Sequence, residues 1–262
     1  MEFLLNTPIA HRGLHNDKMP ENTMPAFRAA IEKGYAIETD VRWTKDDQLI
    51  IFHDETLKRV AKINKRVRDC TLEQLRKIRL NGEHIPLFSE LLEEVNGRVP
   101  LLIEIKHIRF SDPKKYIGQI ESLLAAYNGS YAIQSFQPMY VRRYKKLHPE
   151  ISCGVLAMAE YSKWTFFGSH WWRLAGFTIK HMSLNFLAHP DFISYRTEDL
   201  PRKSVEKFKG KKFAWVVRGA EEEARVRPFV DNIIFENYLP ETDFTPPPQP
   251  ETKDLPEPQM QL

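Results

Sequence analysis

The sequence has few of the features that mark secreted, membrane-spanning or zinc-binding chains. It contains 2 cysteines in 262 residues, too few for a disulfide framework, and we expect Cys70 and Cys153 to be buried thiols. No apolar run approaches the ~18 residues that a membrane span needs. The first residues, MEFLLNTPIAH, lack a basic segment and a long apolar stretch, so they do not resemble a secretory signal. We therefore expect a soluble, cytoplasmic protein with no transmembrane segment.

A large excess of one charge is also missing. Lys and Arg number 38 while Asp and Glu number 35, which gives a formal net charge of +3. So small an excess, spread over the chain, predicts no nucleic-acid partner. Hydrophobic residues make up 42% of the sequence, enough for one large core. The sequence shows no internal repeat of fixed period and gives no indication of an oligomeric state.

Short apolar runs alternate with longer amphipathic stretches, which is the pattern of an α/β protein. Several runs are apolar without alternation, as in strands of a parallel sheet that is covered on both faces. The expected strands are Thr7–Ala10, Ala36–Val41, Leu49–Phe52, Leu101–Ile105, Tyr131–Gln134, Ser152–Leu156, Lys180–Leu184, Lys212–Val217 and Asn232–Phe235. Expected helices between them include Thr23–Lys33, Pro113–Tyr127 and Pro138–Leu147. About eight such units favour a TIM (β/α)₈ barrel over an open doubly wound sheet, although periodicity alone does not separate the two.

Two regions depart from this alternation. Residues 54–97 contain no convincing core strand, but they carry a basic run at Lys58–Arg68 and helical patterns at Leu72–Ile78 and Phe88–Val95. We expect an insertion there, packed at the mouth of the barrel. Residues 240–262 hold seven of the 18 prolines and almost no apolar residues, which predicts a disordered tail. The chain is thus divided into a barrel over residues 1–239, with an insertion at 54–97, and a Pro-rich tail at 240–262.

Three carboxylates lie in strands that are otherwise apolar. Glu38 and Asp40 are two residues apart in one expected strand, so both side chains point to the same face, and Glu104 lies within LLIEIKH. Buried carboxylates must be paired or must bind a metal, and three that are brought together repel one another. Ligands that are all oxygen favour Mg²⁺ or Ca²⁺, and without a His-x-His or Cys-x-x-Cys pair zinc fits poorly.

Histidines and cations accompany these carboxylates. His11 and Arg12 close the first expected strand, His53 closes the run at 49–52, and Lys106 follows Glu104. Imidazoles suit proton transfer near neutral pH, one accepting and one donating. A metal with flanking cations would stabilise a phosphoryl group and a departing alkoxide. The pattern therefore favours phosphodiester cleavage.

Simpler interpretations exist for single residues. A lone histidine such as His84, His148 or His189 is typical of a surface or capping position, and Glu38 with Asp40 alone would serve as ion-pair partners for a nearby arginine. The whole set is harder to attribute to packing, because its members fall at the ends of separate expected strands.

A series of short motifs follows the chain from residue 8 to about 236. In order they are HRG at 11–13, PENTMPAF at 20–27, IETDV at 37–41, TKD at 44–46, HD at 53–54, TLEQL at 71–75, IPLFSE at 85–90, IEIK at 103–106, QSF at 134–136 and AWVVR at 214–218. Together they resemble the signature of the glycerophosphodiester phosphodiesterase (GDPD) family. The resemblance implies a (β/α)₈ barrel with a small insertion after the second histidine.

The resemblance also implies an activity and a role for each matching residue. Family members hydrolyse glycerophosphodiesters, which are small molecules, to sn-glycerol 3-phosphate and an alcohol. The implied roles are metal binding for Glu38, Asp40 and Glu104, general acid and base for His11 and His53, and phosphate binding for Arg12 and Lys106. Within this scheme we predict that His53 is the base and His11 the acid. The last strand departs from the pattern, since Phe235-Glu236 stands where Thr-Asp is more usual.

The segment Tyr161–Phe177 is dense in aromatic residues. A helix that covers the barrel, or a dimer contact, is the simpler interpretation. The functional one is an apolar lip that admits lysophospholipids or allows peripheral contact with a membrane. Two alternatives to the leading function therefore stay open, a lysophospholipase D-type phosphodiesterase and an inactive phosphodiester-binding module. Intact His11 and His53 argue against the second.

Overall fold

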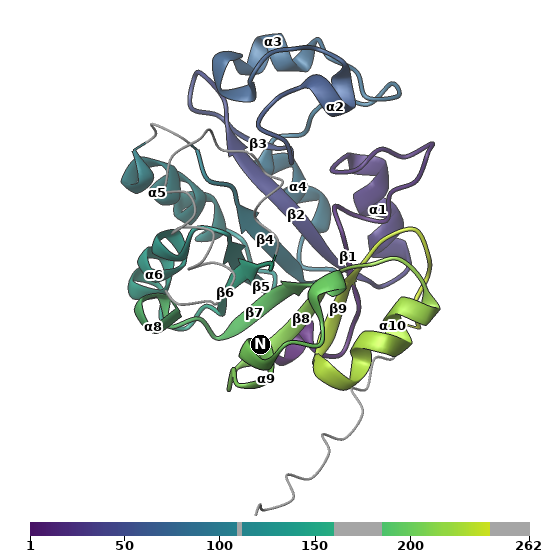
Figure 1. Ribbon diagram of the computed structural model, residues 1–262. Coiled ribbons are helices and arrows are strands. Elements are labelled where there is room, and N and C mark those ends of the chain that lie inside the picture. The colour runs from purple at the N-terminus through teal and green to yellow at the C-terminus, as the bar shows by residue number, and fades with distance from the viewer. Residues whose placement is uncertain (109–111, 160–184, 242–262) are drawn as a thin grey trace, which may run out of the picture.

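A closed barrel of parallel strands forms the centre of the molecule. The computed structural model describes residues 1–108, 112–159 and 185–241 (Figure 1). Its strands are β1 Ile9–Ala10, β2 Ala36–Trp43, β3 Leu49–Ile51, β4 Leu101–Ile105, β5 Tyr131–Ser135, β6 Cys153–Ala157, β7 Phe192–Arg196, β8 Lys211–Val217 and β9 Asn232–Phe235. Neighbours follow the order β1-β9-β8-β7-β6-β5-β4-β2, and β1 also pairs with β2, so eight parallel strands close on themselves. The predicted TIM barrel is confirmed.

Two strands differ from the sequence prediction. The run Leu49–Phe52 contains β3, but β3 pairs antiparallel with the end of β2 and lies outside the barrel. The second is β7, a barrel strand between β6 and β8 that the apolar pattern misses because Ser194 and Arg196 interrupt it. The strand expected at Lys180–Leu184 and the aromatic segment Tyr161–Phe177 lie outside the described residues.

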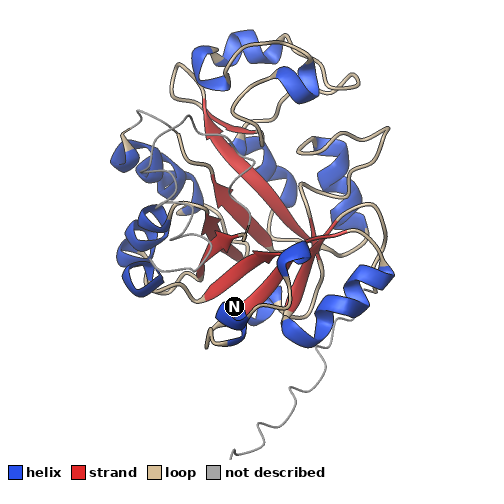
Figure 2. Ribbon diagram, viewed as in Figure 1, coloured by secondary structure: helices blue, strands red, loops and turns tan. Residues whose placement is uncertain are grey.

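Helices surround this barrel (Figure 2). They are α1 Met24–Glu32, α2 Lys58–Ala61, α3 Leu72–Arg76, α4 Phe88–Val95, α5 Pro113–Leu124, α6 Pro138–Leu147, α8 Asn185–Ala188, α9 Lys203–Glu206 and α10 Ala220–Val226, with 3₁₀ turns at Glu2–Leu4, Val67–Asp69, Thr197–Asp199 and Arg227–Phe229. Prolines begin α5 and α6, where a missing N–H costs no hydrogen bond. Thr23 precedes α1 as expected, but its hydroxyl donates to the carbonyl of Pro20 over 2.6 Å instead of capping the helix.

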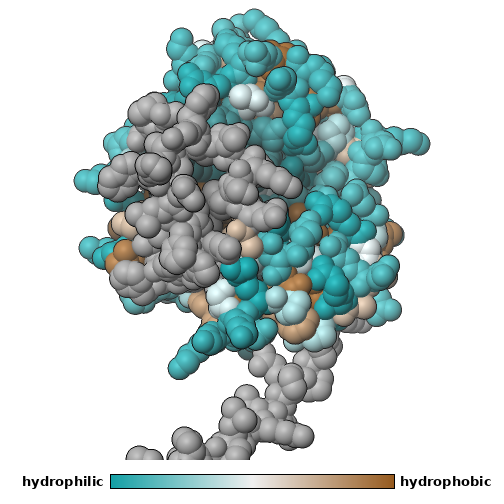
Figure 3. Space-filling view, in the orientation of Figure 1, coloured by the Kyte–Doolittle hydropathy of each residue, from teal (hydrophilic) through white to brown (hydrophobic). Residues whose placement is uncertain are grey.

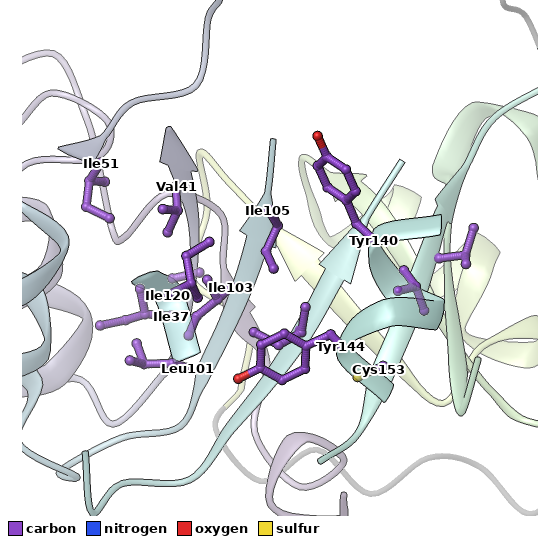
Figure 4. Close-up of a cluster of buried hydrophobic side chains, with 14 of the residues drawn as sticks. Ile37, Val41, Ile51, Leu101, Ile103, Ile105, Ile120, Tyr140, Tyr144 and Cys153 are labelled. Atoms are coloured by element: carbon purple, nitrogen blue, oxygen red, sulfur yellow. The ribbon is translucent and has the colours of Figure 1, made fainter. Parts of the chain in front are cut away.

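Side chains alternate along the barrel strands between two apolar layers. Those that point outward pack against the helices in the main core cluster, where Figure 4 shows Ile37 and Ile103 beside Ile120. Those that point inward, together with Leu4 of the N-terminal 3₁₀ turn, close the lower end of the barrel: Ile9, Ala36, Leu102, Ala132, Phe192, Phe213 and Ile234. Because side chains in a strand repeat every two residues, the next inward positions along each strand lie above this layer, toward the carboxyl ends.

The insertion has a small core of its own, beyond the upper end of β2 (Figure 1). That core consists of Ile50, Phe52, Leu57, Val67, Cys70, Leu75, Leu80 and Ile85. The helix α4 differs, because its apolar side chains belong to the main core cluster and it packs beside α1. We therefore propose that the insertion spans residues 54–86 and that α4 is a helix of the barrel. Cys70 and Cys153 are both free and buried, as predicted.

The visible surface of the described residues is mainly hydrophilic on the face in Figure 3. Large exposed apolar side chains are scattered over distant parts of the fold: Ile63, Met139, Leu147 and Leu239. Of the helices that the structure describes, none has both the length and the apolar character required to cross a bilayer. Residues 242–262, most of the expected Pro-rich tail, lie outside the described residues.

Candidate active site

The expected site residues meet inside the upper part of the barrel. His11, Glu38 and Glu104 each lie two residues after a member of the inward-facing apolar layer, so their side chains also face the barrel axis. The pairing of β2 with β4 places Asp40 opposite Glu104. Lys106, two residues further on, faces the same way. Alternation thus places these side chains above the apolar layer.

Glu38, Asp40 and Glu104 form one buried cluster. An oxygen atom from each carboxylate lies within 4.8 Å of the others. The three residues are only 2%, 1% and 5% exposed. Charges this close, out of contact with water, repel unless cations neutralise them. The carboxylates predicted to bind a metal therefore do come together.

Two cations lie against this cluster. The ammonium of Lys106 is 2.8 Å from Oδ1 of Asp40 and 2.7 Å from Oε1 of Glu104, while Nε of Arg12 is 3.5 Å from Oδ2 of Asp40. Burial opposes ionisation of Asp40, but Lys106, His53 and Arg12 together hold its pKa well below the usual range. Lys106, expected to bind phosphate, is thus paired here with two of the expected metal ligands.

The ionised form of Glu38 is stabilised less well than that of Asp40. Its Oε2 accepts a hydrogen bond from the backbone N–H of Arg12 over 3.1 Å. Burial, with the neighbouring charges of Asp40 and Glu104, raises the pKa of Glu38 well above its ordinary value, and burial also raises the pKa of Glu104. A divalent cation would supply the positive charge that lets all three ionise. Because the donors are hard oxygen atoms, the cluster fits such a cation.

The loop after β1 holds Arg12 in place. Arg12 has a left-handed backbone with φ of 56°, and its carbonyl accepts a hydrogen bond from the N–H of Asn22 over 2.9 Å. Its Nη1 donates to Oε1 of Glu21 over 2.7 Å. Asn22 in turn donates from Nδ2 to Oδ2 of Asp40 over 2.8 Å. This loop therefore joins the arginine to the carboxylate cluster through Glu21 and Asn22.

His53 reaches the site through the β2–β3 hairpin and does not follow a barrel strand, contrary to expectation. The N–H of Phe52 donates to the carbonyl of Asp40 over 3.0 Å, and Nε of Arg42 donates to the carbonyl of His53 over 2.8 Å. Nδ1 of His53 lies 2.6 Å from Oδ1 of Asp54. An Nδ1–H donated to that carboxylate leaves Nε2 as the acceptor. Burial, then the charge of Lys106, lowers the pKa of His53 to about 4.

His11 has a matching carboxylate partner from the other end of the barrel sequence. Its Nδ1 lies 2.7 Å from Oε2 of Glu236, and Oε1 of Glu236 accepts a hydrogen bond from Nε of Arg218 over 2.8 Å. Burial, then the charge of Arg12, lowers the pKa of His11 to about 4, although Glu236 acts in the opposite direction. Burial therefore favours the neutral form of both imidazoles.

Glu236 is a site residue that the sequence interpretation did not assign. The sequence shows it only as a departure from the family pattern at the end of the last strand. The available signal was its spacing, since Glu236 lies two residues after inward-facing Ile234, just as His11 lies two residues after Ile9. Ile9 pairs with both Ala36 and Ile234, so the three strands bring His11, Glu38 and Glu236 to one level.

Comparison with known proteins identifies the family of the chain. Residues 11–227 match the glycerophosphoryl diester phosphodiesterase family. A glycerophosphodiester phosphodiesterase from Caldanaerobacter subterraneus subsp. tengcongensis is 32% identical over 253 residues, which cover 89% of this chain and 94% of the relative.

Solved structures show the same fold. A phosphodiesterase from Oleispira antarctica, in complex with the product sn-glycerol-3-phosphate, has a TM-score of 0.72 at 21% identity and covers 88% of this chain and 92% of its own. A glycerophosphodiester phosphodiesterase from Thermotoga maritima has a TM-score of 0.66 at 22% identity, with coverage of 87% and 94%. The family match over most of the chain and the shared barrel lead to one conclusion: this chain belongs to the glycerophosphoryl diester phosphodiesterase family of enzymes.

Proposed function

We propose that this chain hydrolyses glycerophosphodiesters to sn-glycerol 3-phosphate and an alcohol, with a divalent cation, Mg²⁺ or Ca²⁺, held by Glu38, Asp40 and Glu104. The observation that carries the proposal is the buried carboxylate cluster with two carboxylate-held imidazoles beside it. Family membership and the product bound to the Oleispira antarctica relative support the substrate class.

The cations of the site have the role of binding the phosphodiester. When bound, a divalent cation at the carboxylates polarises the phosphoryl group and stabilises its developing charge. Such a cation would compete with Lys106 for Asp40 and Glu104, which frees the ammonium for the phosphate oxygens. Arg12 stays fixed by Glu21 and adds a second positive charge. Positive groups fixed in a dry site stabilise charge more strongly than they would in water.

The two histidines move the protons. Neutral His53 accepts the proton of the nucleophile as its oxygen bonds to phosphorus. If that nucleophile is a water molecule, glycerol 3-phosphate forms directly; if it is the 2-hydroxyl of the substrate glycerol, a cyclic 2,3-phosphate forms, which a water molecule must then open to give glycerol 3-phosphate. His11 donates a proton to the alcohol oxygen as the bond between phosphorus and that oxygen breaks. His11 must gain this proton in the complex. The anionic substrate promotes its protonation by offsetting the charge of Arg12, and Glu236 stabilises the imidazolium.

A coupled assay for glycerol 3-phosphate tests this proposal. Glycerophosphocholine, glycerophosphoethanolamine and glycerophosphoglycerol would each be incubated with the protein in Mg²⁺ or Ca²⁺ and after removal of metal with EDTA. We expect release that is lost in EDTA and restored by added cation, because the carboxylate cluster cannot hold the phosphate without it. Equal rates with and without EDTA would contradict the metal role, and no release from any substrate would contradict the function.

The lysophospholipase D-type alternative depends on the aromatic segment Tyr161–Phe177, which lies outside the described residues. The same preparation, assayed on lysophosphatidylcholine beside glycerophosphocholine, compares the two activities directly.

Glu236→Gln is expected to lower kcat at pH 7 by on the order of 100-fold, because the amide cannot stabilise the His11 imidazolium. Loss of the carboxylate charge lowers the pKa of His11, since Glu236 acts to raise it. Less His11 is then protonated at pH 7 in the enzyme–substrate complex, so the alkaline limb of the kcat–pH profile moves to lower pH. The measurement is that profile between pH 5 and 9. Glu222→Gln, which removes a carboxylate of α10 that contacts Arg218 only through the backbone N–H, is the control. A profile unchanged by Glu236→Gln would remove this residue from the mechanism.

A further inference from the structure

Arg59 of the insertion bridges two acidic side chains from separate loops of the site. Its Nε and Nη2 donate to the two oxygens of Asp54 over 2.7 and 3.0 Å. Its Nη1 and Nη2 donate to the two oxygens of Glu21 over 2.7 and 2.6 Å. The planar guanidinium makes both contacts at once because its donors form a fixed fork. Asp54 follows β3 and Glu21 follows β1, so Arg59 ties the two loops together.

Each of these carboxylates also contacts a member of the site. Asp54 accepts the hydrogen bond that orients the imidazole of His53, over 2.6 Å. Glu21 accepts the hydrogen bond that holds the guanidinium of Arg12, over 2.7 Å. A continuous chain of contacts therefore runs from the imidazole through Asp54, Arg59 and Glu21 to Arg12. Asp54 and Arg59 are its members from the insertion.

The lowered pKa values of Glu21 and Asp54 are consistent with this chain of contacts. Partial burial opposes ionisation of Glu21, but hydrogen bonds and charges from Arg59 and Arg12 lower its pKa to about 2. Burial likewise opposes ionisation of Asp54, and His53 and Arg59 hold its pKa well below the usual range. Arg66, another arginine of the insertion, is different because it pairs with exposed Asp69 three residues away on the same segment. Insertion arginines are thus not equivalent, and Arg59 is the one directed at the site.

We propose that Arg59 is a positioning residue, and that through it the insertion sets His53 relative to Arg12. The inference rests on the proposed function for its kinetic consequence, because it assigns the base and the phosphate-binding cation to that reaction. Arg59 does not touch the substrate in this scheme. It keeps the imidazole and the guanidinium at a fixed separation, which transfer of a proton at a bound phosphodiester requires.

The test compares Arg59→Lys, Arg59→Gln and the control Arg66→Gln. We expect both Arg59 variants to lower kcat by about 10- to 100-fold, a loss typical of residues that orient catalytic groups. Lysine keeps the positive charge but cannot contact both oxygens of Asp54 and both oxygens of Glu21 at once, so Arg59→Lys should retain little more activity than Arg59→Gln. Guanidinium ion added at millimolar concentration should rescue Arg59→Gln and not Arg66→Gln. Circular dichroism and thermal unfolding would check that each variant folds.

A second measurement needs no substrate. In protein labelled with ¹⁵N-histidine, the Nδ1–H of His53 should give a strongly downfield proton that Arg59→Gln broadens or shifts and Arg66→Gln leaves in place. An unchanged signal in a folded Arg59→Gln protein, or kcat equal to that of the parent, would overturn the positioning role. A shifted signal in a protein that hydrolyses no glycerophosphodiester would support the positioning role and refute the proposed function.

Discussion

Replacement of His53 or His11 by alanine is expected to lower kcat for glycerophosphodiester hydrolysis by about 10³-fold, the usual contribution of a positioned acid or base. A carboxylate orients each imidazole through Nδ1, Asp54 for His53 and Glu236 for His11. In the alanine variants a water molecule would have to transfer the proton, and it would not be oriented in this way. Steady-state release of glycerol 3-phosphate measures the loss. The effect should fall mainly on kcat, because neither imidazole is the group that binds phosphate.

A third histidine provides the matched control. His148 lies after α6, with Nε2 3.0 Å from Oε1 of Glu121, on the outside of the barrel. His148→Ala should therefore retain the activity of the parent chain. Comparable losses in all three variants would indicate general destabilisation, and full activity in either site variant would contradict the assignment of that histidine.

The same substitutions have an expected effect on stability that does not depend on substrate. An unfolded histidine binds a proton with a pKa near 6.5, whereas His11 and His53 in the fold have pKa values lowered to about 4. Between these values the unfolded state binds more protons, so the free energy of unfolding decreases as pH falls from 6.5 to 4. Variants without one histidine should lose less stability over that interval, as thermal unfolding at each pH would show.

Glu38→Gln is expected to abolish most activity yet leave the metal-free protein as stable as the parent or more stable. In the fold the pKa of Glu38 is raised well above its ordinary value, by burial and then by Asp40 and Glu104. At pH 7 the unfolded carboxylate is ionised, so folding without metal must either bury that charge or bind a proton, and both cost free energy. A neutral amide of the same shape avoids this cost but is a weaker ligand for a hard cation.

Thermal unfolding with and without Mg²⁺ or Ca²⁺ separates this outcome from a purely structural role. A cation that binds only the folded parent raises its Tm, by mass action. Glu38→Gln should lose most of that increase, while its Tm in EDTA should equal or exceed that of the parent. Glu94→Gln removes a surface carboxylate paired with Arg28 and Arg98 and serves as the control. A parent protein whose Tm does not respond to either cation would contradict the metal site.

Much of this site could be predicted from sequence because successive side chains of a strand point to opposite faces, which determines the ones that face the barrel axis. Glu38 and Asp40 had to share a face, and the parallel register then placed Glu104 beside them. The motifs named His11 and His53, but apolar runs could not show that the strand before His53 turns back on β2. A hairpin strand and a barrel strand have the same composition, and only the pairing partner distinguishes them.

The residues that the sequence did not assign share another property. Glu236 and His11 are 225 positions apart and meet only because the first and last strands pair. Arg59 stands in a basic run whose other members point elsewhere, so nothing local distinguishes it. Such contacts depend on closure of the barrel and on the path of the insertion, and neither leaves a periodic signal.

That closure has a consequence for the order in which the active site forms during synthesis. Every catalytic, phosphate-binding and metal-binding residue assigned from the motifs is present once residue 106 has been made, yet the carboxylate that orients His11, that of Glu236, directly follows the last strand. A nascent chain would therefore contain all of these motif residues while residues 107–236, about half of the chain, are still to be made before His11 can meet Glu236. We therefore expect full activity only after both ends of the barrel sequence have met, so that the rate of turnover would report a completed fold.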